Sequence, residues 1–264
     1  MKTIYHFSGA GNDFVVIDGR EGDVSAFREV PRIEALCQEY KTDGLMILGS
    51  GDAEVDFTME FYNPDGSGGM MCGNGGRCIV AFADYLGIRP SSGGVFLFMA
   101  PDGLHTGEIL ERPADDLWTV RIKMIDVQGI TPMLGGYFLN TGTRHFVKFV
   151  DDVEQVDVAA EGKALRWNEA FAPIGTNVNF VHVAPDGLHV RTFEKGVEGE
   201  TLACGTGLTA CALVAHHAGV PTATPGAYRL RARQDWLSVN FTPGADEKFT
   251  DVYLTGPARL VEIR

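Results

Sequence analysis

The sequence predicts an α+β fold of two similar, pseudo-symmetric domains, each a curved, mostly antiparallel sheet around a central helix. Three observations predict it. The phrase CGNGG at 72–76 is echoed by CGTG at 204–207, and a shift of 132 residues, half of the 264 in the chain, superposes the two cysteines. Self-similarity at a fixed offset is the signature of a repeated structural unit. A strand-like run precedes each phrase, and an apolar, helix-like segment follows it.

The same offset aligns the flanks of the two phrases without gaps. Phe61 falls on Phe193, each eleven residues before its cysteine, and Gly87 falls on Gly219, each fifteen residues after it. A glycine just past an apolar segment is typical of a helix end. One shift therefore aligns a strand, a glycine turn and a helix end.

The individual elements follow from local patterns. The runs 55–61 and 188–193 alternate in polarity, as half-buried strands do. The segments 79–87 and 208–219 are apolar almost all round, which indicates buried helices. Short runs rich in β-branched and aromatic residues predict the other strands. In chain order these are 13–18, 44–49, 94–100, 118–124, 145–150, 177–183, 228–233, 237–241 and 252–256.

The repeat also predicts the domain limits. We expect an N-terminal domain over 1–116 and a C-terminal domain over 117–256. The offset does not account for the last segment, 257–264, which we expect to return to the first domain.

Composition narrows the classes of function. The chain is 45% hydrophobic and 22% charged, which suits a globular protein with a sizeable core. A formal charge of −13 and a pI near 4.9 argue against a nucleic acid or an anionic membrane as partner. No stretch approaches the roughly 20 apolar residues of a membrane helix, and the start lacks the pattern of a signal peptide. We expect a cytoplasmic protein that acts on a small molecule.

Cys72 and Cys204 are expected in the first turns of the two apolar helices. Unpaired backbone N–H groups and the helix dipole favour anions there, which lowers the pKa of a thiol and can hold a carboxylate. Related by a pseudo-two-fold axis, the two thiols would flank one α-carbon. One thiolate then removes the α-proton while the opposite thiol protonates the other face. This arrangement predicts stereoinversion of an amino acid.

The other three cysteines are expected to be buried apolar residues. Cys78 and Cys211 lie within the apolar segments, and Cys37 stands alone. The spacings C-x5-C and C-x6-C do not suit zinc, and no motif for pyridoxal phosphate is present. The sequence therefore predicts neither a metal nor a cofactor.

Six phrases together resemble the diaminopimelate epimerase family and cover nearly the whole chain. The resemblance implies a pair of similar domains with the site between them, no cofactor and a homodimer. It implies an isomerase that interconverts LL- and meso-2,6-diaminopimelate in lysine and peptidoglycan precursor biosynthesis. The phrases are SGAGNDF (8–14), FYNPDGS (61–67), MCGNGGRC (71–78), RHFV (144–147), TNVNF (176–180) and EKGVEGETLACGTG (194–207).

The resemblance also implies residue roles. Cys72 and Cys204 match the two acid/base thiols, His145 the partner of the first and Glu194 the partner of the second. Backbone at the two cysteine turns would hold the α-carboxylate, and side chains would hold the distal amino-acid end. The implied substrate-binding positions are Asn12, Asn63, Gly73, Asn74, Thr143, Asn177, Lys195, Gly205 and Thr206.

Three features depart from the family pattern. Lys195 stands where arginine is usual, Thr143 where asparagine is usual, and the loop 37–44 is shorter than usual and lacks Gly-Ile-Gly. Lysine offers a point charge where arginine offers a bidentate fork. All three departures concern the distal end of the substrate or its neighbourhood.

Three alternatives stay open at this point. A proline or hydroxyproline epimerase shares the two-thiol logic but typically carries histidine where Asn74 stands. A phenazine-biosynthesis-type isomerase shares the architecture but usually lacks the thiols. A non-catalytic protein in which Cys72 and Cys204 form a redox-switched disulfide is the third.

Overall fold

The computed structural model describes residues 2–69 and 71–264. The chain divides into two compact units, Met1–Ile122 with Gly256–Arg264 and Lys123–Thr255. The sequence placed the division after residue 116, whereas the structure keeps 117–122 with the first unit because that strand pairs there on both sides.

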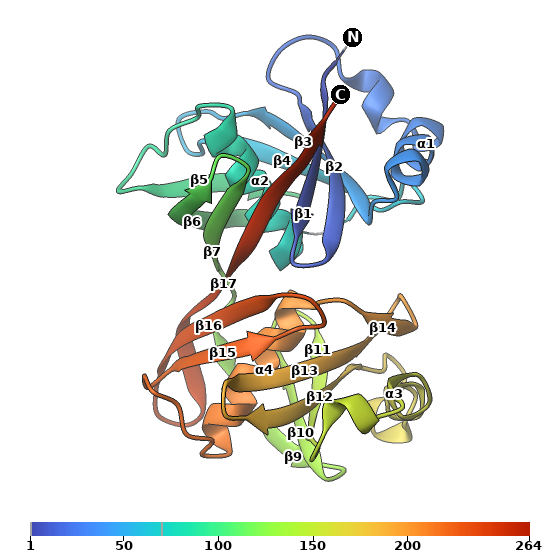
Figure 1. Ribbon diagram of the computed structural model, residues 1–264, viewed down its shortest axis with the longest axis vertical. Coiled ribbons are helices and arrows are strands. Elements are labelled where there is room, and N and C mark those ends of the chain that lie inside the picture. The colour runs from blue at the N-terminus through green and yellow to red at the C-terminus, as the bar shows by residue number, and fades with distance from the viewer. Residues whose placement is uncertain (1, 70) are drawn as a thin grey trace. The chain divides into compact units, whose positions relative to one another are not determined.

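The first unit is a sheet that closes on itself (Figure 1). Hydrogen-bonded neighbours run from β1 through β2, β3, β4, β5, β6 and β7 to β17, and β17 pairs with β1 again. The β2–β3 and β4–β5 pairs are parallel and the others antiparallel. The strands are β1 (Ile4–Gly9), β2 (Asn12–Asp18), β3 (Gly44–Ser50), β4 (Phe57–Tyr62), β5 (Val95–Ala100), β6 (Gly103–Ala114), β7 (Leu117–Lys123) and the end of β17 (Lys248–Ile263).

Helix α2 (Gly73–Tyr85) is the core of this unit and lies on the crossover between β4 and β5, because parallel strands need such a connection. It contacts β1, β2, β3 and β6, and every residue from Gly73 to Ala83 is buried. The helix ends at Tyr85, Leu86 is its C-cap, and Gly87 takes a positive φ of 77°. At its other end the helix begins six residues before the apolar segment 79–87, because residues 73–78 are helical as well.

A second helix covers the outside of the sheet, and the sequence did not predict it. Helix α1 (Val30–Tyr40) follows the short 3₁₀ helix η1 (Ser25–Arg28) and packs Ile33, Leu36 and Cys37 against β2 and β3. The prediction of a loop over 37–44 is wrong for residues 37–40, because these form the last turn of α1. The i, i+3, i+4 spacing of the three buried residues is the signal that was available.

The second unit repeats this topology (Figure 1). Its order is β9–β10–β11–β12–β13–β15–β16–β17–β8, with β14 paired to β13, and its parallel pairs are β11–β12 and β13–β15. The strands are β8 (Val127–Gln128), β9 (Thr131–Met133), β10 (Gly136–Asn140), β11 (Arg144–Phe149), β12 (Asn177–Ala184), β13 (Gly187–Glu194), β14 (Gly199–Thr201), β15 (Ala227–Arg231), β16 (Trp236–Pro243) and the first part of β17.

Helix α4 (Gly205–His217) takes the place of α2, on the crossover between the parallel strands β13 and β15. It contacts β10, β11, β12, β13, β15 and β16, and ends before Gly219, whose φ is 73°. Helix α3 (Val158–Arg166) takes the place of α1 and lies between η2 (Val153–Gln155) and η3 (Glu169–Phe171). The sequence did not predict α3 either, although Asp157 caps it by accepting the Ala160 N–H at 3.0 Å. The two units thus share one strand order, two parallel pairs and two helices in equivalent places.

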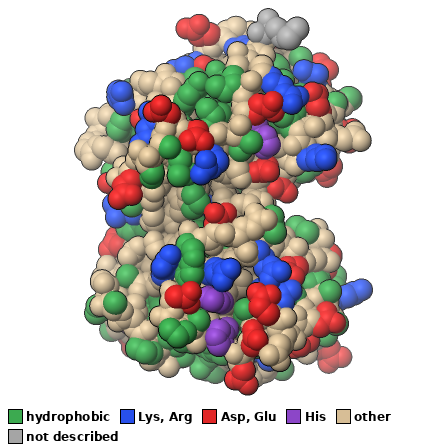
Figure 2. Space-filling model, viewed as in Figure 1, with side chains coloured by type: hydrophobic (Ala, Val, Ile, Leu, Met, Phe, Trp, Pro, Cys, Tyr) green, Lys and Arg blue, Asp and Glu red, His purple; other side chains and the backbone are tan. Residues whose placement is uncertain are grey.

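Two further observations concern the distribution of surface charge and the lengths of the helices. Figure 2 shows acidic and basic side chains interspersed over the visible face, on a chain of net charge −13. Within residues 2–69 and 71–264, no helix is long and apolar enough to cross a membrane.

Candidate active site

Both cysteines of the repeated phrases are N-cap residues. Cys72 has an extended backbone (φ −105°, ψ 150°) before α2, and its Sγ accepts the Gly75 N–H at 3.2 Å. Cys204 has an extended backbone (φ −118°, ψ 107°) before α4. The sulfur of an N-cap cysteine lies beside the first N–H groups of its helix, where the dipole favours negative charge. The exposure of the two differs, since Cys72 is exposed and Cys204 is 8% exposed.

A buried guanidinium supports the first helix start. Arg77 is fully buried and donates to the Gly73 carbonyl at 3.2 Å and to Asn74 Oδ1 at 2.9 Å. Asn74 in turn donates through Nδ2 to Asn12 Oδ1 at the start of β2. The structure thus brings together the predicted residues Asn12, Gly73 and Asn74. The Asn74 side chain is engaged on both sides, by Arg77 and by Asn12.

Asn63 lies in the segment between β4 and α2. Its Nδ2 donates to Ser67 Oγ at 3.0 Å, and its backbone N–H donates to the Ser67 carbonyl at 2.9 Å. These bonds make 63–67 a compact turn and hold Asn63 half-buried. The structure therefore places this predicted residue in the turn, separately from the Asn12–Asn74 pair.

A buried histidine supports the second helix start. His145 on β11 is fully buried, and its Nε2 lies 3.0 Å from Thr206 Oγ1. Thr206 Oγ1 also lies 3.5 Å from Cys204 Sγ, so the hydroxyl connects the ring to the thiol. Burial, together with the nearby charge of Lys195, lowers the pKa of His145 to about 3, which keeps the ring neutral near pH 7. Within the second unit His145 is thus linked to Cys204 through Thr206, and its expected role toward Cys72 stays a prediction.

Glu194 is the last residue of β13, at the turn toward β14. Its Oε2 accepts a hydrogen bond from Thr201 Oγ1 at 2.9 Å. Thr201 ends β14, and the chain reaches Cys204 three residues later. The Glu194 carboxylate is therefore hydrogen-bonded to the segment that leads to Cys204.

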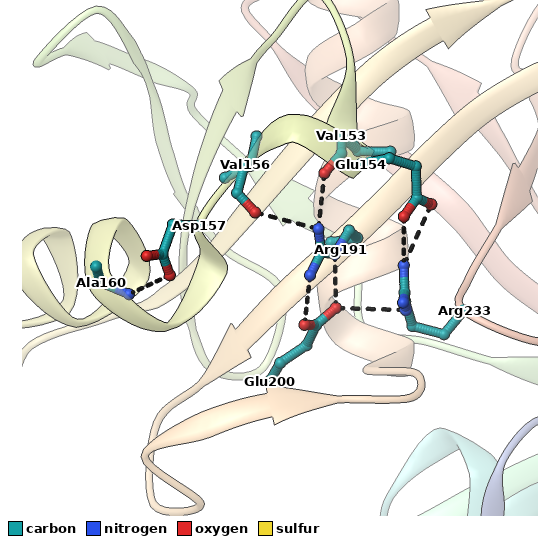
Figure 3. A network of polar contacts seen from close by, with 8 residues as sticks. All are labelled: Val153, Glu154, Val156, Asp157, Ala160, Arg191, Glu200 and Arg233. Carbon is teal, nitrogen blue, oxygen red and sulfur yellow. Dashed lines mark hydrogen bonds and ion pairs between the residues drawn. The ribbon is translucent and has the colours of Figure 1, made fainter.

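An arginine network holds β14 in place (Figure 3). Arg191 forms a fork on Glu200, with both N–O distances at 2.7 Å, and also donates to the Val153 carbonyl at 2.8 Å. Arg233 joins Glu200 to Glu154, at 3.5 and 3.0 Å. Arg191 holds the pKa of the Glu200 carboxyl below its ordinary value. These ion pairs fix the strand that precedes Cys204.

Three predicted distal-end residues meet around one amide. Asn177 is buried, donates to the Arg144 carbonyl at 2.8 Å and lies 3.5 Å from Thr143 Oγ1. Its Oδ1 accepts the Lys195 N–H at 2.8 Å. Three of the positions that the family resemblance assigned to distal binding or its neighbourhood thus form one cluster at the ends of β11, β12 and β13.

The carbonyl groups of the first turn of α4 are occupied. Thr141 Oγ1 donates to the Thr206 carbonyl at 2.9 Å, and Thr209 Oγ1 donates to the Gly205 carbonyl at 3.0 Å. The N–H groups of a first helical turn have no partner within the helix. The two predicted positions Gly205 and Thr206 therefore offer N–H donors, not carbonyl oxygens, to a ligand.

Three residues of these networks were not predicted from the sequence, namely Arg77, Asn179 and Thr192. Arg77 belongs to the quoted phrase MCGNGGRC, and Asn179 to TNVNF. The available signal for Asn179 was its position inside an apolar strand, where asparagine is disfavoured, and on the same face as Asn177. Thr192 lies directly opposite Asn179 on β13, and only the pairing of the strands shows this.

A metal site has no obvious place among these groups. Within the described residues, no three His, Cys, Asp or Glu side chains lie close enough together to hold a metal ion.

The chain matches a family model described as diaminopimelate epimerase over residues 4–92 and 137–261. It is 40% identical over 263 residues to a diaminopimelate epimerase of Chlorobaculum tepidum, covering 96% of this chain and 97% of the relative. It is 37% identical over 262 residues to that of Flavobacterium psychrophilum, covering 98% and 97%. It is 39% identical over 273 residues to that of Aquifex aeolicus, covering 96% and 93%.

Two solved structures share the fold at low identity. A Bacillus anthracis phenazine biosynthesis protein of the PhzF family superposes with a TM-score of 0.77 at 10% identity, covering 100% of this chain and 98% of its own. A hydroxyproline epimerase from Agrobacterium vitis gives 0.66 at 15% identity, covering 100% and 91%. These likenesses support the α+β fold predicted from the repeat.

Proposed function

The chain belongs to the diaminopimelate epimerase family, and we propose that it interconverts LL- and meso-diaminopimelate with Cys72 and Cys204 as its two acid/base groups. One observation carries the proposal. Each of two topologically equivalent units places a cysteine at the N-cap of its central helix. Each unit would then be one epimerase-like domain that contributes one thiol.

The proposed step is a proton exchange without a cofactor. One sulfur, as thiolate, takes the α-hydrogen as a proton, and the C–H electron pair moves toward the carboxylate to give an enolate-like state. The opposite thiol then gives its proton to the other face of the carbon. The first sulfur ends as thiol and the second as thiolate. The starting state returns when the first sulfur releases its proton to water and the second takes one up, or when the enzyme turns over in the reverse direction. The mechanism requires the two sulfurs on opposite faces of one α-carbon.

The helix starts supply the electrostatics of this step. The N–H groups at Gly73–Asn74 and Gly205–Thr206 would bind the substrate α-carboxylate. Negative charge grows on that carboxylate as the proton leaves, and preformed N–H donors stabilise it most at that moment. The glycines of both turns leave room for the close approach.

His145 and Glu194 would tune the thiols. The family assigns His145 to the first thiol and Glu194 to the second. The hydroxyl of Thr206, between His145 and Cys204, adds a contact of the histidine with the second thiol. The thiols would then differ in their environment while performing the same chemistry in opposite directions.

The cluster of Thr143, Asn177 and Lys195, together with Asn12 and Asn63, would bind the distal ammonium and carboxylate of the substrate. Amides and a cation suit a second amino-acid centre, which a proline racemase need not recognise. Homodimer formation and a cytoplasmic location are proposed on the family resemblance alone.

Deuterium exchange at the α-carbon tests this function. The protein is incubated in D₂O with LL-diaminopimelate, proline or glutamate, and proton NMR follows the α-signals. We expect exchange and inversion with diaminopimelate only, without added pyridoxal phosphate and in the presence of a chelator. Exchange of proline but not diaminopimelate would identify the sister isomerase. If none of the three exchanges and activity does not appear on adding reductant, the two-thiol mechanism is rejected.

A further inference from the structure

The amide of Asn179 has only one orientation that satisfies its surroundings. Asn179 is fully buried on β12. Its Nδ2 donates to the Phe146 carbonyl at 3.1 Å, and its Oδ1 accepts from Thr192 Oγ1 at 2.9 Å. A flipped amide would place its oxygen against the carbonyl oxygen of Phe146, and two acceptors repel. The backbone carbonyl therefore fixes which end of the amide is the donor.

This orientation determines the tautomer of His145. The second Nδ2 hydrogen of Asn179 points at His145 Nδ1, 3.0 Å away. A nitrogen that accepts a hydrogen bond carries no proton, so the single proton of the neutral ring lies on Nε2. Nε2 then donates to Thr206 Oγ1 at 3.0 Å.

The tautomer in turn directs the Thr206 hydroxyl. A hydroxyl has one hydrogen, and when its oxygen accepts from Nε2 that hydrogen is available for another acceptor. Cys204 Sγ lies 3.5 Å from the same oxygen. In the other tautomer the hydroxyl would donate to the ring and leave the sulfur without this donor.

We propose that Asn179 is a positioning residue that locks His145 with its proton on Nε2, so that the Thr206 hydroxyl donates to Cys204 and favours its thiolate. The inference rests on the proposed two-thiol function and extends it to a residue that touches neither substrate nor sulfur. A hydrogen bond to the charged form of a thiol lowers its pKa.

The first turn of α4 is shaped around this chain of contacts. A Cβ built on Gly207 would lie 2.4 Å from Asn179 Oδ1 and 3.3 Å from both His145 Cε1 and Cys204 Cβ. Only glycine allows the turn that carries the thiol to lie against the amide and the ring together. The burial that lowers the His145 pKa also keeps the ring from taking a second proton at Nδ1.

Nitrogen-15 NMR of histidine-labelled protein tests the tautomer in the wild-type chain. The His145 signals are assigned by their loss in His145→Gln. Between pH 6 and 8 we expect a protonated Nε2 and an unprotonated Nδ1. A proton on Nδ1 would overturn the proposal, and this measurement does not depend on any activity.

The substitution Asn179→Asp tests the consequence for the thiol. A carboxylate replaces the donor, so the His145 proton moves to Nδ1 and Thr206 turns away from Cys204. We expect kcat for diaminopimelate to fall roughly 10- to 100-fold, the range for groups that orient a reacting group through hydrogen bonds. The acid limb of the kcat profile should move to higher pH, with KM changed much less. Asn168→Asp, the same change at the half-buried N-cap of η3, is the control and should match the wild type.

Two results would contradict the proposal, and a second variant tests it if Asn179→Asp does not fold. An Asn179→Asp enzyme with wild-type kcat and pH profile, or one whose His145 keeps its proton on Nε2, would reject the locking role. If that variant does not fold, Thr192→Val removes only the donor to Asn179 Oδ1 and should give a smaller shift in the same direction. If wild-type protein exchanges no diaminopimelate α-proton, the function fails while the NMR result still decides the tautomer.

Discussion

The first turns of α2 and α4 have the same kind of backbone geometry, but different side chains support them. Under the repeat offset Asn74 corresponds to Thr206, and Arg77 to Thr209. Arg77 and Thr209 each donate to the carbonyl four residues earlier, Gly73 and Gly205, at 3.2 and 3.0 Å. The duplicated unit has kept this bond while exchanging a guanidinium for a hydroxyl. Both units therefore place a cysteine at the N-cap of the central helix through the same backbone geometry, whichever side chain makes this bond.

The side-chain supports have diverged. Beneath the first start, a Cβ on Gly75 would meet Cys72 Sγ at 3.3 Å and Met46 Sδ at 3.4 Å. Beneath the second, the equivalent Gly207 faces the polar groups of Asn179 and His145. Gly75 in the first start thus packs near the Met46 thioether, and Gly207 in the second lies against a neutral polar network. The two helix starts therefore have distinct environments.

The largest effect is expected from removing either sulfur. Cys72→Ala and Cys204→Ala should each lower the rate of inversion by at least about 10³, because each side of the α-carbon loses its only proton carrier. Circular dichroism should show an intact fold in both. Full turnover in either variant would mean that the two starts are not partners in one reaction.

The next largest effect is expected from removing the two equivalent hydrogen bonds, that of Arg77 to Gly73 and that of Thr209 to Gly205. Arg77→Met leaves several buried acceptors of a charged donor unsatisfied and should lower the free energy of unfolding by about 3 kcal/mol. Thr209→Val removes one neutral hydrogen bond and should cost about 1 kcal/mol. Urea denaturation, followed by probes in each unit, measures both. Equal losses would show that the guanidinium does no more than the hydroxyl.

The paired glycines should respond unequally to alanine. Gly207→Ala places a methyl group against Asn179 Oδ1, at 2.4 Å before relaxation, and should cost about 1–3 kcal/mol. Gly75→Ala meets the Cys72 sulfur and the flexible side chains of Met46 and Met59, and helix propensity favours it by up to ~1 kcal/mol. Thermal melts compare the two. A Gly75→Ala variant that is the less stable of the pair would contradict the packing difference.

The pH dependence of stability should distinguish positions 145 and 13, which are equivalent under the repeat. The pKa of His145 falls from 6.5 to about 3 on folding, so the unfolded chain binds more protons between these values. Stability from this group is complete above pH 6.5 and is lost by about 1.4 kcal/mol per pH unit as the pH falls toward 3. His145→Gln should remove that slope. Asp13, whose pKa lies below its usual 3.8 mainly because of its contact with His6 Nε2, 3.7 Å away, should matter only below that value.

The smallest effect concerns the distal cluster. Lys195→Arg adds a bidentate donor and should lower KM for diaminopimelate by roughly 2- to 10-fold, the worth of one added hydrogen bond. Lys163→Arg, on the exposed face of α3, is the matched control. Initial-rate kinetics measure both, and an unchanged or higher KM for Lys195→Arg would count against distal binding at this position.

Much of the fold follows from local pattern. The strands at 13–18 and 44–49 appear as β2 and β3, and the apolar segments appear inside α2 and α4. The peripheral helices α1 and α3 were not predicted, although α1 carries apolar residues at helical spacing and α3 begins at an aspartate cap. The boundary near 116 shifted because pairing of β7, a non-local property, assigns 117–122 to the first unit.

The sequence by itself determined the duplication, the place of each cysteine before a buried helix and the family. These depend on residues close together along the chain, so spacing and hydrophobic period reveal them. Only the tertiary structure decided what supports each helix start. The contacts of His145 with Asn179 and Thr206 join residues 34 and 61 positions apart, and Arg77 reaches Pro257 across 180. Strand pairing and burial bring these groups together, and no local pattern encodes which polar atoms then meet.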